Sequence, residues 1–201
     1  MLACALVVAA TASARVVRIP AIARECRGDL AWSDVMKCTG TYGDAKLAKT
    51  LPHARVVHLA GHEGDKPSAP GVYLFVEAKG TWQLGGMYEG EVSVLGLERV
   101  TLGSHTAYRI DIAASDHTQV SLDDVTTTPA LYVRREQLYC AGVGYHCTTV
   151  MTSCDVLVGG KAVATFRGTV TSKDTTLHIA GDRTHAGSEC DQAEDVPVYF
   201  P

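Results

Sequence analysis

The sequence lacks the short motifs that mark several classes of enzyme and cofactor-binding protein. It contains no C-x-x-C redox pair, no H-E-x-x-H zinc motif, no G-x-S-x-G nucleophile elbow and no P-loop. The stretch GVGYHC at 142–147 begins like a dinucleotide-binding fingerprint, but the third glycine is missing and no βαβ pattern surrounds it. No motif therefore assigns a catalytic residue, and the catalytic residues of any enzyme activity are unknown.

The sequence also has little excess charge of either sign. It carries 18 basic and 22 acidic residues, a net charge of −4. This balance gives no basic surface for a nucleic acid and no acidic tail. Hydrophobic residues make up 46% of the chain, which is typical of a globular protein. We expect a folded domain whose partner is an unknown protein or small-molecule ligand, and not a nucleic acid.

No transmembrane segment is expected, because the N-terminal apolar run at residues 2–10 is too short to span a bilayer. It is followed by Ala12-Ser13-Ala14, an A-x-A cleavage pattern, and then by Arg15. No Lys or Arg precedes the run, although signal peptides usually begin with one. We predict a signal peptide at residues 1–14, and the alternative is a buried N-terminal strand or helix.

The number of cysteines agrees with export. There are seven, and cleavage after Ala14 would remove Cys4. An even number then remains, which fits three disulfides formed in an oxidising compartment. The six are Cys26, Cys38, Cys140, Cys147, Cys154 and Cys190. We therefore predict that the protein is secreted or periplasmic.

Three of these cysteines lie close together in YCAGVGYHCTTVMTSC, residues 139–154. With His146 they could be zinc ligands, but structural zinc sites usually present pairs such as C-x2-C, and here the gaps are longer. A turn at residues 142–144 would place Cys140 opposite Cys147 on paired strands, within disulfide distance. We therefore favour a Cys140–Cys147 disulfide.

Cys154 is expected to have a distant partner. Its odd spacing from Cys147 would turn it to the other face of a regular strand. Cys38 and Cys190 are the candidates.

A second group of candidate ligands lies in HLAGHEGD, residues 58–65. On a helix His58 and His62 would share a face, but the β-branched residues before them and the glycines after favour a strand followed by a loop. Imidazole and carboxylate groups gathered in a loop bind Zn, Ni or Cu. His58, His62 and Glu63 are thus candidates for a transition-metal site, and no other cofactor is expected. The alternative is a polar surface loop.

Helices are expected only near the start of the chain. Asp29 can cap a helix that Gly40 ends, and Asp44 can open a second short helix that stops before Pro52.

From residue 54 onward the pattern changes to short β segments with turn signals about every 8–12 residues. Hairpin turns are expected at residues 78–80 and at Gly159-Gly160. In YRIDIA, Tyr108, Ile110 and Ile112 alternate with polar residues, as in a strand with one buried face.

The fold class predicted from these patterns is mainly β (α+β), a single antiparallel sandwich or barrel-like domain with one or two short N-terminal helices, stabilised by disulfides. The domain would span residues 26–190. A basic lead-in at 15–25 precedes it and a C-terminal tail at 191–201 follows.

For function, the sequence favours an exported binding or structural module of the envelope or extracellular space. The alternative is an exported hydrolase, metal-dependent through His58, His62 and Glu63.

Overall fold

The computed structural model describes residues 45–59, 71–78, 81–121, 127–141, 147–184 and 190–200. Within these ranges every regular element is a β-strand and there is no helix, which confirms the prediction of a β-rich, antiparallel fold. The predicted signal peptide, the basic lead-in, the helix at 29–40, Cys26 and Cys38 all lie outside the described residues.

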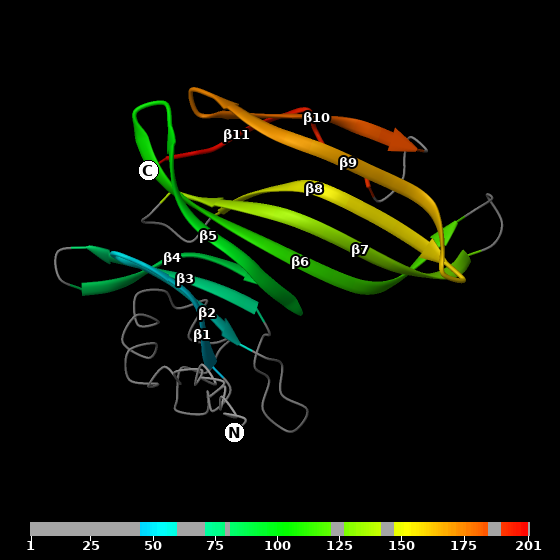
Figure 1. Cartoon of the computed structure of the whole chain (residues 1–201), viewed down its shortest axis with the longest axis horizontal. Helices are drawn as coiled ribbons and strands as arrows, with labels where there is room; N and C mark the ends of the chain where they lie inside the picture. Colours follow the sequence, from blue (N-terminus) through cyan, green and yellow to red (C-terminus); the bar gives the residue numbers. More distant parts are fainter. Residues whose placement is uncertain are drawn as a thin grey trace, which may run out of the picture.

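The strands form two antiparallel sheets, which lie one above the other in Figure 1. The four-stranded sheet has the order β1-β2-β3-β4, and the seven-stranded sheet has the order β11-β10-β9-β8-β7-β6-β5. The first sheet contains β1 (Ala45–Leu51), β2 (Ala54–Leu59), β3 (Gly71–Ala78) and β4 (Thr81–Glu89). The second contains β5 (Val92–Leu102), β6 (His105–Ser121), β7 (Thr127–Cys140), β8 (Cys147–Val158), β9 (Lys161–Lys173), β10 (Thr176–Thr184) and β11 (Asp195–Pro197).

The short helix predicted after Asp44 is wrong, because Ala45–Leu51 is strand β1. It pairs with β2 from Ala45↔Leu59 to Leu51↔Ala54, across a turn at Pro52 and His53. The Ala, Lys and Leu residues of this segment favour a helix in isolation, but pairing with an apolar neighbouring strand outweighs that local preference.

The two sheets pack through a shared core. The alternation predicted for Tyr108, Ile110 and Ile112 is confirmed, since all three side chains are buried. They contact side chains of β2 and β3 from the other sheet, among them Val56 and Leu74. The hydrophobic face of β6 is thus covered by the four-stranded sheet.

The hairpin turn predicted at Gly159-Gly160 is present between β8 and β9. Both glycines have positive φ, 56° and 79°, as a two-residue turn of this kind requires. Away from this turn the two strands separate. Their pairing ends at Ser153↔Arg167, while β9 continues beside β10. Residues 147–152 of β8 therefore have no β9 partner.

A β-bulge changes the expected orientation of Cys154. The register between β7 and β8 shifts between Arg135↔Ser153 and Glu136↔Met151, which leaves one extra residue in β8. The extra residue reverses the alternation, so Cys154, opposite Arg134, shares a sheet face with Cys147. The prediction that Cys154 faces the other way is wrong because it assumed a regular strand.

Candidate functional site

The C-terminal segment, residues 190–200, packs on the seven-stranded sheet and is anchored to it at several points. Cys190 forms a disulfide with Cys154 of β8, with their Cα atoms 5.6 Å apart. Farther along, β11 pairs with the start of β10. Near the end, the ring of Phe200 stacks on His105 with ring centroids 4.4 Å apart. The segment thus joins strands that are far apart in the sequence.

Gln192 supplies a second anchor to β8, where β9 has separated from it. Its side-chain carbonyl accepts a hydrogen bond from Met151 N at 2.7 Å, and its side-chain amide donates one to Met151 O at 2.6 Å. One side chain therefore satisfies two main-chain groups that no neighbouring strand reaches. Together with the Cys154–Cys190 disulfide, this pair of bonds fixes residues 190–192 against β8.

The C-terminal segment and β10 separate beyond Ile179. β11 pairs only with Thr176–His178, and Ile179 N donates one further hydrogen bond to Glu194 O at 2.7 Å. Beyond this point a recess of about 410 Å³ opens between β10 and the C-terminal segment. It is lined by Ile179, Ala180, Gly181, Arg183 and Glu194.

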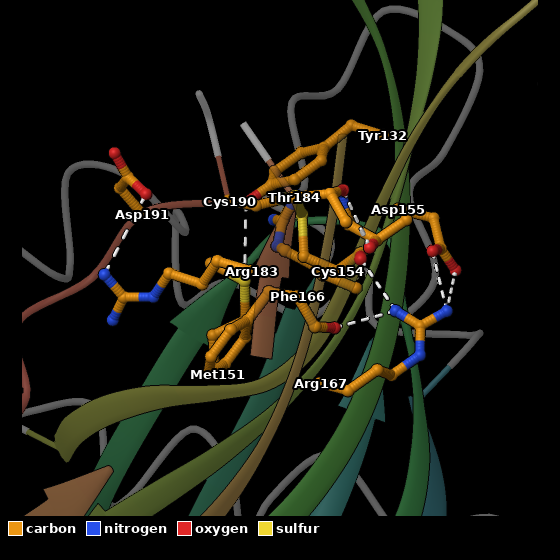
Figure 2. Close-up of a disulfide and its surroundings, with 12 residues drawn as sticks. Tyr132, Met151, Cys154, Asp155, Phe166, Arg167, Arg183, Thr184, Cys190 and Asp191 are labelled. Carbon is orange, nitrogen blue, oxygen red and sulfur yellow. Dashed lines mark hydrogen bonds and ion pairs between the residues drawn. A yellow bond between two sulfur atoms is a disulfide. The ribbon is translucent and has the colours of Figure 1, made fainter. Parts of the chain in front are cut away.

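Arg183 crosses from β10 to the C-terminal segment at this recess. Its Nη2 donates a hydrogen bond to Gln192 O at 3.0 Å, and its Nη1 lies 4.0 Å from an oxygen of Asp191. The guanidinium carbon lies 5.4 Å from the centre of the Phe166 ring, an arrangement that Figure 2 shows. Arg183 is thus held in place from both sides.

At Gly181 the wall of the recess consists of main-chain atoms, because glycine has no side chain. A Cβ atom at this position would lie 2.2 Å from Arg167 O and 2.5 Å from the Cα of Gly168 on β9. The two strands approach too closely there for any side chain. The recess therefore exposes a strand edge beside one cation and one carboxylate, those of Arg183 and Glu194.

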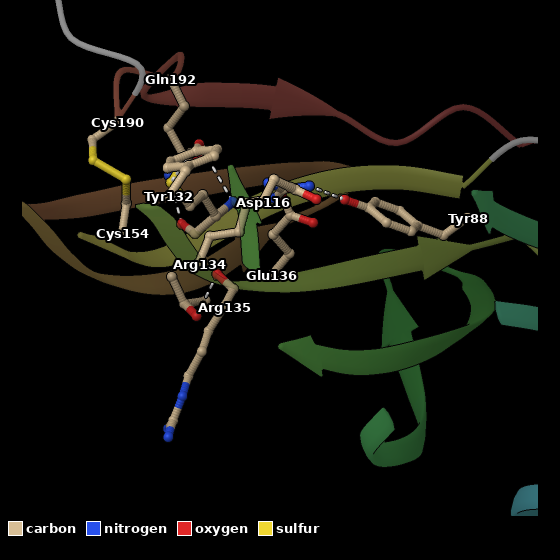
Figure 3. A network of polar contacts seen from close by, with 11 residues as sticks. Tyr88, Asp116, Tyr132, Arg134, Arg135, Glu136, Cys154, Cys190 and Gln192 are labelled. Atoms are coloured by element: carbon tan, nitrogen blue, oxygen red, sulfur yellow. Dashed lines mark hydrogen bonds and ion pairs between the residues drawn. A yellow bond between two sulfur atoms is a disulfide. The ribbon is translucent and has the colours of Figure 1, made fainter. Parts of the chain in front are cut away.

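A second polar cluster lies between the sheets and is centred on Arg134 of β7, whose side chain is 15% exposed. Its Nε lies 2.9 Å from Glu136 Oε1, its Nη1 pairs with Asp116 of β6, and its Nη2 donates to the hydroxyl of Tyr88 at 2.8 Å. The ring of Tyr132 lies beneath the guanidinium at 4.9 Å. Tyr88 belongs to the four-stranded sheet, so the cluster links the two sheets (Figure 3).

Burial shifts the pKa values in this cluster. The pKa of Tyr88 is raised, chiefly by desolvation, and the Glu136 carboxylate adds to this while Arg134 opposes it. Burial alone would lower the pKa of Arg134, but Tyr88, Glu136 and Asp116 together raise it above its usual value. The guanidinium therefore stays charged and the phenol stays neutral at ordinary pH.

The Arg134 cluster is arranged for structure. Within the described residues, each of the three guanidinium nitrogens contacts an oxygen atom of the same chain, those of Asp116, Tyr88 and Glu136. The one buried atom of the cluster without a hydrogen bond within the described residues is Glu136 Oε2. A single water is enough to satisfy such an atom. The recess beside β10 is thus the better candidate for a binding site.

The structure joins Cys140 to Cys147, the pairing that the sequence favoured, with the Cα atoms 4.2 Å apart. Of the two candidate partners of Cys154, it selects Cys190. All four sulfurs are bonded to sulfur, so Cys140, Cys147 and Cys154 are not zinc ligands here. His146 lies outside the described residues.

The candidate metal ligands are divided between described and undescribed parts of the chain. His58 is half-buried in β2, where it pairs with Val72 and Lys46. His62 and Glu63 lie outside the described residues, so this metal site stays a prediction. Within the ranges that the structure describes, no group of three or more His, Cys, Asp and Glu side chains could hold a metal ion, and no helix is long and apolar enough to cross a membrane.

The sequence pattern did not lead to a prediction of the Arg134 cluster or of the recess beside β10. Arg134 and Glu136 sit two residues apart in YVRREQ, and charged side chains at alternate strand positions can mark a polar patch on one face. That spacing was a usable signal for the cluster. Arg183 and Glu194 had no such signal, because their proximity depends on the Cys154–Cys190 disulfide.

No family model matches the chain, and neither the curated proteins nor the solved structures contain a match.

Proposed function

We propose that this chain is an exported, disulfide-stabilised β-sandwich that acts as a binding module, with the recess between β10 and the C-terminal segment as its ligand site. The observation that carries the proposal is the way residues 190–192 are fastened to β8. The Cys154–Cys190 disulfide and the two Gln192–Met151 hydrogen bonds hold the recess open. A site preformed in this way loses little entropy when a ligand binds.

The size and lining of the recess support binding of a small ligand or a short stretch of a larger one. Its volume of about 410 Å³ lies in the range of ligand pockets. Its polar groups include the Arg183 guanidinium, the Glu194 carboxylate and main-chain groups of β10.

An oxidising compartment is supported by the cysteines. The chain closes two disulfides, and such bonds persist chiefly in secreted or periplasmic proteins. The export test is to express the untagged full chain and measure the mass of the fractionated protein, with and without reductant before alkylation. We expect a chain that begins at Arg15 and has no free thiol among its six cysteines. An uncleaved cytosolic protein with seven free thiols would contradict the proposal.

The binding test uses the oxidised full chain and two probe sets, a small-molecule fragment library and a random heptapeptide library. Amide chemical shifts in NMR spectra report where a probe binds. We expect at least one set to shift the amides of Ile179, Gly181 and Arg183. Hits confined to other surfaces, or no hits in either set, would reject the recess as the ligand site.

The exported metal-dependent hydrolase remains the alternative from the sequence. Its test is metal analysis of protein purified without an affinity tag, and a metal stoichiometry near zero would count against His58, His62 and Glu63 as ligands.

A further inference from the structure

We propose that the recess binds an extended peptide segment, which adds as a strand to the open edge of β10 at Gly181 and Arg183. This inference rests on the proposed binding function and names the ligand class of the same site. Three observations support it: the direction of the main-chain groups of β10, the fastening of residues 190–192 to β8, and the charges of Arg183 and Glu194 beside the recess.

The main-chain groups of Gly181 and Arg183 face the recess. Those of Ile179 face the C-terminal segment, because Ile179 N bonds to Glu194 O. Successive residues of a strand direct their main-chain groups to opposite sides, so Gly181 and Arg183 share this direction. Ala180 faces β9 instead, where the hydroxyl of Thr169 donates to Ala180 O at 3.3 Å.

These groups have no main-chain partner among the described residues. The pairing of β10 with β11 ends at His178↔Asp195, and Ile179 N–Glu194 O is the last main-chain hydrogen bond between described residues on that edge. Residues 180–184 are all exposed. A strand edge of this kind offers donors and acceptors to another extended chain.

The chain's own C-terminal segment is kept from completing this edge. After Glu194 it lies close enough to pair with β10, but residues 190–192 are tied to β8 by Cys190 and by the Gln192 side chain. To pair with Gly181, residues 190–192 would have to leave β8 and break the hydrogen bonds between Gln192 and Met151. The edge is therefore open because of a covalent constraint and not for lack of a nearby segment.

Spacing and charge indicate the chemistry of the peptide. Gly181 and Arg183 present their groups about 6.7 Å apart, which is the repeat of a strand that bonds at every second residue. Arg183 already donates to Gln192 O, whereas the Glu194 carboxylate has no ion-pair or hydrogen-bond partner among the described residues. We therefore expect a peptide that carries a basic side chain next to Glu194, running antiparallel to β10.

The experiment compares Arg183→Ala with Arg183→Pro in the oxidised full chain, using lysine-containing heptapeptides selected from a displayed random library. Alanine removes the side chain but keeps the main-chain N–H, whereas proline also removes that N–H. Proline is tolerated at a strand edge whose N–H faces outward. Closure of the Cys154–Cys190 disulfide and the melting temperature report whether each variant folds.

We expect Arg183→Pro to bind the peptides about fivefold more weakly than Arg183→Ala, the effect of one main-chain hydrogen bond. Methylating single peptide nitrogens should weaken binding to the unmodified protein at every second position only. This second arm needs no protein variant and stays informative if Arg183→Pro does not fold.

Equal affinity of the two variants, together with no effect of N-methylation, would overturn strand addition. Fragments that bind the recess while no heptapeptide does would also overturn it, but would leave the proposed binding function in place.

Discussion

At the scale of single residues, Arg134 is expected to contribute strongly to stability through its buried ion pair. It neutralises Glu136, whose side chain is only 10% exposed, and it also pairs with Asp116 and Tyr88. Arg134→Met would leave the Glu136 carboxylate buried without a cation. We expect the free energy of unfolding in urea to fall by about 3 kcal/mol.

The matched control for Arg134 is Arg99→Met. Arg99 is exposed, and its one side-chain hydrogen bond to another described residue is a long one, 3.5 Å to Thr106. The Arg99→Met substitution should change the free energy of unfolding by less than about 0.5 kcal/mol. Similar small losses for both variants would show that the cluster does not contribute to stability.

Gly86 is needed where the two sheets meet at a disulfide. A Cβ atom there would lie 2.2 Å from the sulfur of Cys147 and 2.9 Å from that of Cys140. Because these sulfurs are fixed, Gly86→Ala should lower the free energy of unfolding by about 1–3 kcal/mol. The loss should shrink when Cys140 and Cys147 are both alanine, because the clashing sulfurs are then absent. An undiminished loss in that double-mutant cycle would contradict the described packing.

Because the pKa of Tyr88 is raised in the folded protein, the free energy of unfolding should depend on pH in the alkaline range. A phenol whose folded pKa lies above its unfolded value of about 10 favours folding while it is neutral. This contribution is complete below that value and is lost as the pH rises through the folded pKa. Chemical denaturation between pH 8 and 11.5 should therefore show falling stability above pH 10, and Tyr88→Phe should reduce the slope. A variant with the same slope as the unmodified protein would place the titration elsewhere.

At the scale of elements, local sequence signals located most strands but not their partners. The strict alternation around Ile110 and the Gly159-Gly160 turn predicted β6 and the β8–β9 hairpin correctly. The strand Ala45–Leu51 was missed because its local preference is helical, and only its pairing with β2 makes it a strand. The orientation of Cys154 was missed because a one-residue bulge leaves no clear signal in the sequence.

The candidate site was less predictable than the strands. Cys190 was a candidate partner of Cys154, but nothing in the sequence indicates that Gln192 completes the main-chain bonding of Met151. The recess lies where the C-terminal segment, fastened to β8 at residues 190–192, separates from β10 beyond Ile179. Such an arrangement depends on contacts between distant residues, which periodicity and turn signals do not encode.

The Cys154–Cys190 disulfide should control the mobility of the C-terminal segment. Replacing both cysteines by serine removes a covalent link across 36 residues. We expect hydrogen exchange of the Ile179 amide to become at least tenfold faster, because its acceptor, Glu194 O, is then held only by weaker contacts. The amide of Ala164, inside the β8–β9 hairpin, is the internal control and should be unchanged. Equal acceleration at both amides would indicate general destabilisation.

At the scale of the whole molecule, the seven-stranded sheet is stabilised by two separate sets of contacts, one with the four-stranded sheet and one with the C-terminal segment. The four-stranded sheet is joined to the seven-stranded sheet through the core around Ile110 and through the Tyr88–Arg134 contact. Away from the four-stranded sheet, the same face of the seven-stranded sheet carries Phe166 and Leu177 and is covered by the C-terminal segment. The recess lies beside the C-terminal segment, so ligand binding should stabilise this segment more than the core between the sheets.

The measurement that tests this account most directly is the disulfide map of the oxidised full chain. Proteolysis without reductant, followed by mass spectrometry of the linked peptides, identifies each pair. We predict a Cys140–Cys147 link and a Cys154–Cys190 link in the same molecule. Cys190 found as a free thiol, or joined to any cysteine other than Cys154, would remove the anchor of the C-terminal segment and contradict the proposed binding site.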